Sequence, residues 1–517
     1  MHKNIITLKT IFQLILDKKP ILIYGQIITM LAVLVSVPIP LILPMMVDEV
    51  LLEKPAGFVE TINYFIGQTN PFVYVAIVTI SVIFLRVSYY LLGAVITKIF
   101  TKISKYVTFM IRKRLIEHLQ ITSMNEYETL GSGAITSNLI TDINTFDSFI
   151  MNTTSKLVSA TLTLLAVSIV MIMLNPILGL LILIIQPLNV LLSKRMSKAV
   201  GVLKKNENDS IEKFQDSVGE TLELYGQIKA SNKEKYFFSE AIKRADTIQT
   251  TSNEYSFKSV IYEKLSTAIS LSMFEILRAS GFLLVVYSDL SIGMMFAMFG
   301  YIWFIMTPIQ EMLSIQYSYA SAMAALSRIN KVLALQTEDT GEKVIETQAV
   351  EIDLKNLDFS YANNKPILKN VSLKIKHGSK IALIGASGSG KTTLAQVLSG
   401  FYEKTAGTLT YNGINTEEID KKSLREKIFL VLQMPILFNS TLRFNITMGE
   451  ENISDEQIHK ALKIAQLHEM IDDMQDGLQT IVGRHGIRLS GGQRQRLSIA
   501  RMVIANPSVV IFDESTS

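Results

Sequence analysis

The chain has 517 residues, of which 49% are hydrophobic, and its mean hydropathy is +0.31. This length exceeds that of one ordinary domain, and this hydrophobicity excludes a wholly soluble protein, so part of the chain is predicted to lie in a membrane. A net charge of +4 does not point to nucleic acid as a partner, and the lack of cysteine excludes disulfides, thiolate catalysis and cysteine-ligated zinc.

The first membrane span is predicted at residues 21–47, which carry no charge and are long enough to cross a hydrocarbon core of about 30 Å. Prolines within this stretch predict an irregular helix. A second span is predicted at residues 71–97, where Arg86 is the one charged residue. Ahead of the first span, apolar residues at helical spacing predict a short helix at the membrane surface: Leu8, Ile11, Phe12 and Ile15.

Residues 157–193 form an uncharged stretch that is too long for one crossing. A residue before proline tends to leave the helical region, so Asn175 followed by Pro176 predicts the turn of a hairpin between a third and a fourth span. The fifth and sixth spans are predicted at residues 265–288 and 290–310. The sequence therefore predicts an α-helical membrane domain with six transmembrane helices.

The distribution of basic residues predicts the orientation of these spans. Residues 98–114 contain lysine and arginine but no acidic residue, and further basic residues follow the fourth span, so both loops are predicted to be cytoplasmic. Both termini are then also cytoplasmic, in a multi-pass protein of a bacterial inner or plasma membrane. The two inner loops are long, so we expect helical hairpins that extend beyond the membrane and turn at residues 125–133 and 219–227.

The composition changes after the last span. We assign residues 1–335 to the membrane domain, residues 336–349 to a polar linker and residues 350–517 to an α/β domain. Residues 385–392 of this domain read G-x-x-x-x-G-K-T, follow the apolar run 381–384 and open a helical run. This context predicts a strand, a phosphate-binding loop and a helix, as in P-loop nucleotide hydrolases.

The phosphate loop has the residues that polyphosphate binding requires. Its glycines let backbone N–H groups approach phosphate oxygens without interference from side chains. We expect Lys391 to reach the β- and γ-phosphates of ATP and the Thr392 hydroxyl to reach Mg²⁺. The predicted ATP-binding residues of this segment are Gly385, Ser387, Gly388, Ser389, Gly390, Lys391, Thr392 and Thr393.

Two acidic residues, Asp513 and Glu514, follow the apolar run 509–512. At the end of a buried strand, Asp513 is placed to hold the metal through water, and Glu514 is placed to polarise the attacking water. A third segment, residues 489–493, reads Leu-Ser-Gly-Gly-Gln. A serine hydroxyl and glycine N–H groups at a helix start form an anion site.

These motifs and the spans before them resemble a half-transporter of the ATP-binding-cassette exporter family over essentially the whole chain. The resemblance implies that the signature, which is Leu489, Ser490, Gly491, Gly492 and Gln493, faces an ATP held by a second subunit. It also implies that Tyr361 stacks on adenine and that Gln433 senses the γ-phosphate, contacts the metal and takes part in catalysis. The partner implied is a second half-transporter, in a homodimer or a heterodimer.

The chain departs from the family pattern in two places. Arg484 and His485 replace the glutamate usual before the signature, so the charge match with the intracellular loops is expected to differ. The chain ends at Ser517, before the D-loop and the switch histidine of the family, so we expect it to lack the end of its nucleotide domain. ATPase activity is accordingly an expectation for the complete protein.

Three charged residues in the predicted spans are candidates for contact with cargo, because charges inside a membrane are costly and often functional. Arg86 lies in the second span, and Glu275 and Arg278 lie three residues apart in the fifth. The last two form either a structural ion pair or a cargo contact. Membrane lipids and a hydrophobic or amphipathic cargo, which is a lipid, a drug or a peptide, are the other expected partners.

The sequence thus predicts ATP-driven export by a dimer that uses ATP and Mg²⁺. Two alternatives stay open at this point. One is a membrane protein of the same fold that uses nucleotide for gating or regulation without pumping. The other is a non-catalytic remnant of a transporter.

Overall fold

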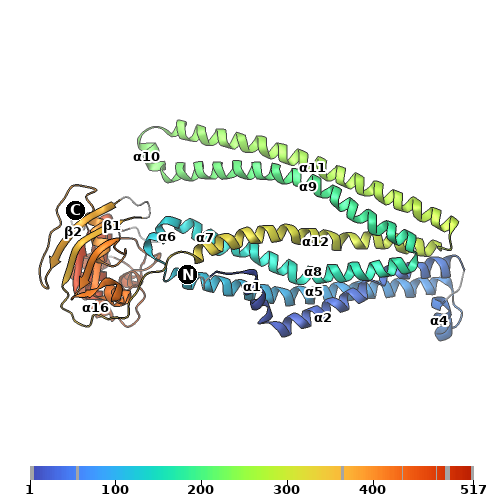
Figure 1. Cartoon of the computed structure of the whole chain (residues 1–517), viewed down its shortest axis with the longest axis horizontal. Coiled ribbons are helices and arrows are strands. Elements are labelled where there is room, and N and C mark those ends of the chain that lie inside the picture. The colour runs from blue at the N-terminus through green and yellow to red at the C-terminus, as the bar shows by residue number, and fades with distance from the viewer. Residues whose placement is uncertain are drawn as a thin grey trace. The chain divides into compact units, whose positions relative to one another are not determined.

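A computed structural model describes residues 5–53, 57–361, 366–433, 435–472, 474–483 and 489–513 (Figure 1). The chain divides into two compact units. The helical unit comprises Ile6–Ile111 and Thr141–Ser327, and the α/β unit comprises Met1–Ile5, Arg112–Ile140 and Arg328–Ser517. The end of helix α5 and the segment after it therefore belong to the same unit as the strands.

The helical unit contains both long and short helices. In chain order they are α1 (Leu8–Leu16), α2 (Lys19–Ser36), α3 (Ile42–Pro44), α4 (Gly57–Ile66), α5 (Pro71–Leu119), α8 (Ile143–Leu174), α9 (Pro176–Glu223), α10 (Tyr225–Ala230), α11 (Glu234–Tyr287) and α12 (Ile292–Leu333). Short 3-10 and π-helical segments are η1 (Ile39–Leu41), η2 (Met45–Leu51) and η3 (Asn138–Asp142). The helix predicted ahead of the first span is therefore confirmed as α1.

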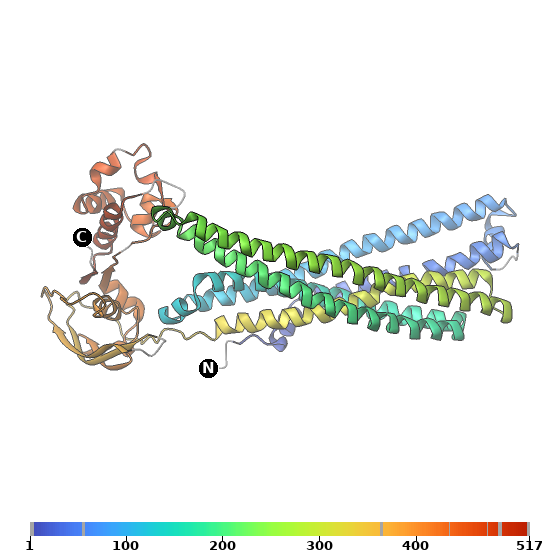
Figure 2. The same ribbon diagram turned by 90° about the horizontal axis from the view of Figure 1, so that it is seen from above.

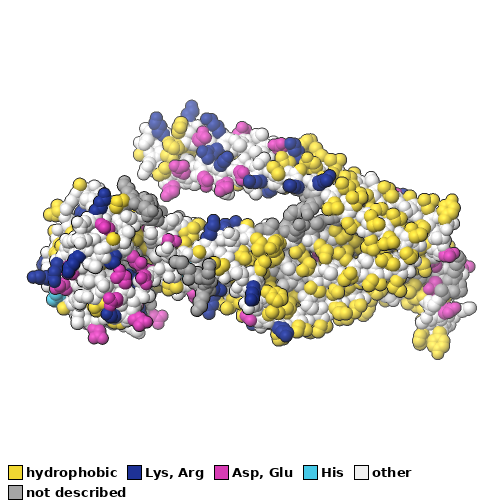
Figure 3. Space-filling view, in the orientation of Figure 1, with side chains coloured by type: hydrophobic (Ala, Val, Ile, Leu, Met, Phe, Trp, Pro, Cys, Tyr) yellow, Lys and Arg dark blue, Asp and Glu magenta, His cyan; other side chains and the backbone are white. Residues whose placement is uncertain are grey.

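Within the described residues, five helical stretches are long and apolar enough to cross a membrane: Lys19–Leu51, Pro71–Leu119, Ser132–Leu174, Glu234–Tyr287 and Ile292–Met312. The fourth predicted span falls in α9, which begins with a shorter apolar segment, Pro176–Ile185. Figure 3 shows hydrophobic side chains over the half of the helical unit that ends at α4, and charged side chains over the hairpin of α9 and α11 near α10. This surface is apolar where a bilayer would contact it.

Prolines explain two predicted features of this unit, the irregular first span and the break between the third and fourth spans. The first span is irregular, as expected, because α2 ends at Ser36 and the chain continues through η1, α3 and η2 around three prolines that lack a backbone donor. The break at Asn175 is also confirmed. Asn175 is extended, its side chain accepts a hydrogen bond of 3.0 Å from the Leu178 N–H, and Pro176 starts α9.

The hairpin of α9 and α11 turns at residues 224–233, which overlap the predicted 219–227 and extend beyond them. The two helices lie side by side with α10 at the tip (Figures 1 and 2). Gly219 lies inside α9, whereas the chain reverses between Leu224 and Lys233. Asn232 has a φ of 53° there, a left-handed conformation that asparagine tolerates, just before α11 begins.

The described residues of the α/β unit form three small sheets. Strands β1 (Ile352–Ser360), β2 (Pro366–Ile375), β3 (Ala406–Tyr411) and β4 (Ile414–Asn415) form an antiparallel sheet in the order β2-β1-β3-β4. Strands β5 (Ile428–Val431) and β8 (Val509–Phe512) pair in parallel, and β6 (Ser440–Thr441) pairs with β7 (Ile481–Val482). The helices are α13 (Lys391–Leu398), α14 (Lys421–Lys427), α15 (Leu442–Thr447), α16 (Asp455–Ile464), α17 (His468–Asp472) and α18 (Gly491–Ala505), and the 3-10 segments are η4 (Thr416–Glu418) and η5 (Gly477–Gln479).

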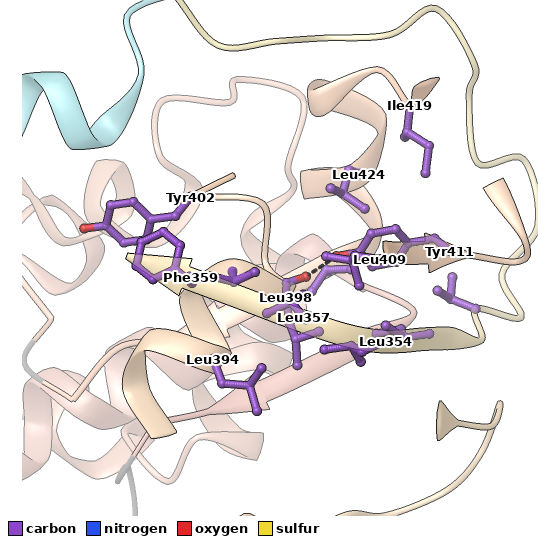
Figure 4. Close-up of a cluster of buried hydrophobic side chains, with 14 of the residues drawn as sticks. Leu354, Leu357, Phe359, Leu394, Leu398, Tyr402, Leu409, Tyr411, Ile419 and Leu424 are labelled. Carbon is purple, nitrogen blue, oxygen red and sulfur yellow. Dashed lines mark hydrogen bonds between the residues drawn. The ribbon is translucent and has the colours of Figure 1, made fainter. Parts of the chain in front are cut away.

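One hydrophobic core joins the antiparallel sheet to α13 and α14 (Figure 4). Leu354, Leu357 and Phe359 of β1 pack with residues of α13, β3 and α14. The Tyr411 hydroxyl is fully buried and donates a hydrogen bond of 2.7 Å to the Leu398 carbonyl at the end of α13. This contact ties the helix after the phosphate loop to the sheet.

The first inner loop packs on the same core. It forms α6 (Met124–Leu130) and α7 (Ser132–Ser137), and Gly131 between them has a φ of 78°, so the turn predicted at residues 125–133 is confirmed. Met124 packs against the core, and the Ser123 N–H donates a hydrogen bond of 2.9 Å to the Gln336 carbonyl. The loop between the second and third spans is therefore part of the α/β unit.

The strand predicted at residues 381–384 is wrong for the described structure. These residues pair with no described strand, and Ile384 is 95% exposed. The strand before Asp513 was expected to be buried, yet Phe512 of β8 is 53% exposed. Residues 381–384 lack the hydrogen-bonded neighbour that a strand needs, and β8 pairs only with β5 among the described residues, so its other edge has no described strand beside it.

Candidate nucleotide site

The phosphate loop adopts a conformation that its glycines permit. Gly388 and Gly390 have φ values of 78° and 92°, in the left-handed region that side chains disfavour. At Gly385, a Cβ atom would lie 2.7 Å from the Ser389 hydroxyl oxygen. Gly390 caps α13, so the loop leads directly into a helix N-terminus, which is the arrangement that backbone N–H groups need to hold phosphate.

Lys391 lies over this loop. Its ammonium group donates hydrogen bonds of 3.0 Å to the carbonyl oxygens of Gly385 and Ala386. The cation is thus held at the loop that is predicted to receive the β- and γ-phosphates. Ser387 and Ser389 lie in the same turn, where the Ser389 N–H donates to the Ala386 carbonyl at 3.2 Å.

The structure brings the two predicted metal-site motifs together. The Thr392 hydroxyl donates a hydrogen bond of 2.9 Å to the Asp513 carboxylate, across 121 residues of sequence. Asp513 is 8% exposed, and its N–H donates to the Val431 carbonyl of β5 at 3.1 Å. A hydroxyl and a carboxylate are ligands that Mg²⁺ prefers, so the pair fits this ion. In the described ranges no group of three His, Cys, Asp or Glu side chains could hold a metal.

Tyr361 lies in an aromatic cluster beside α13. Its ring is 4.9 Å from that of Phe359 and 5.4 Å from that of Tyr402, measured between centroids. Its hydroxyl forms hydrogen bonds with the Thr393 hydroxyl at 3.2 Å and the Gln396 amide oxygen at 3.4 Å. The predicted adenine-stacking aromatic is therefore fixed to the helix that follows the phosphate loop.

Tyr402 connects this cluster to the first inner loop, a link that sequence reasoning missed. Its hydroxyl donates a hydrogen bond of 2.6 Å to the Glu128 carboxylate of α6. Burial raises the pKa of Tyr402 above its ordinary value, and the bond to Glu128 raises it further, so the hydroxyl keeps its proton and donates. No motif marks either residue, because the contact joins two distant segments.

The predicted signature forms the start of α18. Ser490 caps the helix: its hydroxyl accepts from the Gln493 N–H at 3.2 Å, and the Gln493 side chain accepts from the Ser490 N–H at 2.7 Å. Leu489 is buried in a hydrophobic cluster, whereas Gly491 and Gly492 are exposed. An anion could therefore approach the glycine N–H groups of this helix start.

Gln433 is linked to the same helix. Its backbone carbonyl accepts a hydrogen bond of 3.3 Å from the Gln495 side chain of α18. This contact connects the segment after β5 to the signature helix. Glu514, Arg484 and His485 lie outside the described residues.

The candidate cargo residues lie on two helices of the helical unit. Glu275 and Arg278 form an ion pair on α11, and their side chains are 52% and 51% exposed. Arg86 is exposed on α5. The pairing that the sequence allowed between Glu275 and Arg278 is thus present.

Comparisons with known proteins find relatives for both parts of the chain. Residues 22–309 match the family model "ABC transporter transmembrane region", and residues 368–517 match the model "ABC transporter". The chain is 31% identical over 415 residues to the "Uncharacterized ABC transporter ATP-binding protein YwjA" of Bacillus subtilis (strain 168), covering 78% of this chain and 71% of the relative. It is 28% identical over 533 aligned residues to the "ATP-dependent lipid A-core flippase" of Pasteurella multocida (strain Pm70), covering 99% and 86%.

A solved structure has the same fold. It is described as a bacterial Atm1-family ABC exporter with ATP bound, and it superposes with a TM-score of 0.75 at 20% identity, covering 96% of this chain and 85% of that one. This likeness shows the fold, and the family models and the Bacillus relative show the family. The chain belongs to the ABC transporters, with the transmembrane region and the ATP-binding domain fused in one polypeptide.

Proposed function

We propose that this chain is one half of a dimeric exporter that moves a hydrophobic or amphipathic cargo across a membrane and is driven by ATP hydrolysis. The observation that carries the proposal is the Thr392–Asp513 hydrogen bond beside a glycine-shaped phosphate loop, in a chain that also has membrane-spanning helices. Relatives named for lipid A-core transport support the class of activity.

Each residue of the site has a chemical role in this proposal. The N–H groups of the phosphate loop and Lys391 bind the β- and γ-phosphates, and Tyr361 stacks on adenine. Thr392, Gln433 and Asp513 would hold Mg²⁺, Asp513 through water, and the bound ion neutralises charge on the phosphate oxygens. Glu514 polarises the attacking water, and Gln433 positions it.

A dimer follows from the exposed signature. The glycine N–H groups at the start of α18 offer an anion site, and we propose that it binds the γ-phosphate of an ATP on the partner subunit. A homodimer is the simplest assembly, and a heterodimer with a related half is the alternative.

The dimer can be tested by mixing subunits. Lys391→Ala alone and Ser490→Ala alone are each expected to inactivate both ATP sites of a homodimer. A dimer with one subunit of each kind should regain close to half of the activity, because one site then has an intact phosphate loop and an intact signature. No recovery in the mixed dimer would mean that each subunit uses its own signature.

Coupling to the membrane helices is proposed to use the first inner loop. Because Glu128 of α6 is hydrogen-bonded to Tyr402, which packs on Tyr361, a movement of the adenine-side aromatic cluster is passed to the loop between the second and third spans. The second inner loop is the hairpin of α9 and α11. We propose that α10, at its tip, passes the same motion to these two helices.

Transport is proposed to proceed outward. Both termini are proposed to lie on the cytoplasmic side of a bacterial inner or plasma membrane. The test of the whole proposal is ATPase activity of the protein in liposomes against a panel of lipids, hydrophobic drugs and peptides. Stimulation by one of these classes supports export. ATP binding with no stimulated hydrolysis in any class would favour a regulatory protein of the same fold.

A further inference from the structure

Helix α4 lies in the connection between the first two spans and has a small hydrophobic core of its own. The connections at Asn175 and at residues 288–291 are short turns. Val59 and Ile62 on one face of α4 are buried against Tyr74 in the first turns of α5. Phe58, Val50 and Ile77 pack around them. The helix is therefore attached to the ends of the first two spans.

Polar contacts fix the position of this helix. The Glu49 carboxylate accepts a hydrogen bond of 2.8 Å from the Val59 N–H in the first turn of α4. The Tyr74 hydroxyl donates to the Asn63 side chain and accepts from the Thr69 N–H at 3.3 Å. These bonds hold α4 between η2 and α5, and the helix runs across the direction of α5 rather than along it (Figure 1).

The held helix leaves its C-terminal end uncovered. Tyr64, Phe65 and Ile66 are 85%, 76% and 60% exposed, and Phe72 in the first turn of α5 is 76% exposed. A hydrophobic patch is visible at this end of the helical unit (Figure 3). Exposing apolar side chains of this size to water is unfavourable, so an occupant is expected.

The chemistry of the patch identifies a lipid interface as that occupant. Aromatic rings concentrate at the boundary between lipid headgroups and acyl chains, where Tyr has an apolar body and a polar tip. Glu60 is the one charged residue of α4, and the sequence of the helix has no basic side chain. Phe72 also begins a helix that is apolar enough to cross a membrane, and Ile80 and Phe84 further along α5 are exposed as well.

We propose that Tyr64, Phe65, Ile66 and Phe72 form an interfacial anchor that inserts into the headgroup boundary of the bilayer leaflet at which α5 begins. The anchor holds the ends of η2 and α5 at a fixed depth through the Glu49 and Tyr74 contacts. By the orientation proposed above, this leaflet is the outer one. The insertion of these side chains does not depend on ATP binding or on the identity of the cargo.

The chain has no cysteine, so single spin labels can test the anchor directly in the intact protein. A label at Phe65→Cys is compared with one at Glu60→Cys, a position that lies about 140° away around the helix and is charged in the native protein. Both proteins are placed in vesicles of phosphatidylcholine and phosphatidylglycerol. Collision rates with oxygen, which partitions into lipid, and with a water-soluble nickel chelate are then measured.

The anchor predicts an oxygen-to-nickel collision ratio several-fold higher at Phe65 than at Glu60. Equal nickel access at both positions would overturn the proposal, and so would shielding of Phe65 from both reagents, which would indicate contact with protein such as a second copy. The chain has one tryptophan, Trp303, so Phe65→Trp in a Trp303→Phe background provides a second measurement. Brominated lipids should quench its fluorescence if the anchor inserts, and failure to quench would contradict it.

Discussion

The hydroxyl of Tyr402 donates a hydrogen bond of 2.6 Å to the carboxylate of Glu128, and the same tyrosine ring packs on Tyr361. One side chain thus contacts both the predicted adenine-stacking residue and the loop between the second and third spans. Hydrogen bonds to charged groups contribute about 1.5–3 kcal/mol, more than neutral ones, so this bond is large enough to matter for coupling.

Removing the Tyr402 hydroxyl is expected to destabilise the α/β unit and to lower the ratio of cargo-stimulated to basal ATPase. Tyr402→Phe keeps the ring, so the expected loss is that of one charge-assisted bond, about 1.5–3 kcal/mol in the free energy of unfolding. Glu128→Ala should lose a similar amount, and the double variant little more than either one. Fully additive losses in denaturant unfolding would mean that the two groups do not interact in solution.

Because Thr392 and Asp513 are hydrogen-bonded, substitutions at both residues are expected to change how ATPase activity depends on Mg²⁺. Asp513→Asn keeps the shape but removes a charge that the ion needs, so ATPase activity should fall by about 100-fold or more. Thr392→Ser keeps a hydroxyl and should retain most activity, whereas Thr392→Val should not. Titration of activity with Mg²⁺ measures this, and equal activity of the serine and valine variants would contradict the role of the hydroxyl.

The ion pair of Glu275 and Arg278 predicts compensation between two substitutions. Removing one charge leaves its partner unpaired on a predicted span, so Glu275→Gln or Arg278→Gln alone should lower the thermal stability. The double variant should recover much of this loss. If the pair also contacts cargo, the double variant will be stable but will lose stimulation of its ATPase. A stable double variant with normal stimulation would reject the cargo role.

The α9–α11 hairpin contains a carboxylate that should make stability depend on pH. Glu207 is bonded to Lys204 at 2.5 Å and to Ser252 of α11 at 2.7 Å, and these bonds lower its pKa below the ordinary 4.5. A lowered folded-state pKa adds stability above the ordinary value, and this stability is lost as the pH falls through the folded-state pKa. The stability difference between the wild type and Glu207→Gln should therefore shrink as the pH is lowered from 7 through 4.5 and below. Glu212→Gln, an exposed position on α9, is the matched control, and a constant difference at Glu207 would contradict the argument.

Local features of the site were predictable because they depend on a few neighbouring residues. The phosphate loop needs glycine at Gly388 and Gly390 for its backbone angles, and the signature caps its helix with Ser490 and Gln493. The approach of Thr392 to Asp513 spans 121 residues, yet it was predictable because both motifs are expected to bind one metal. A shared ligand role thus predicts the approach of two motifs that lie far apart in the sequence.

Other features could not be predicted, because they depend on how distant segments pack. The Tyr402–Glu128 bond joins residues 274 apart that belong to no motif. The predicted hairpin turn at 219–227 contains the end of α9, but the sequence does not show that Gly219 stays helical or that the reversal continues through α10 to Asn232. The strand expected at residues 381–384 has the right composition, but composition alone does not supply a pairing partner.

The central claim is that this protein uses ATP to move a cargo across a membrane. The most direct test reconstitutes it in liposomes that contain fluorescently labelled lipid or enclose a hydrophobic dye, and follows movement across the bilayer with and without ATP. We expect ATP-dependent movement in the wild type and none in Lys391→Ala, because that variant lacks the principal cation for the phosphates. Movement that is equal in the two proteins, or ATP hydrolysis with no movement of any probe class, would contradict the claim.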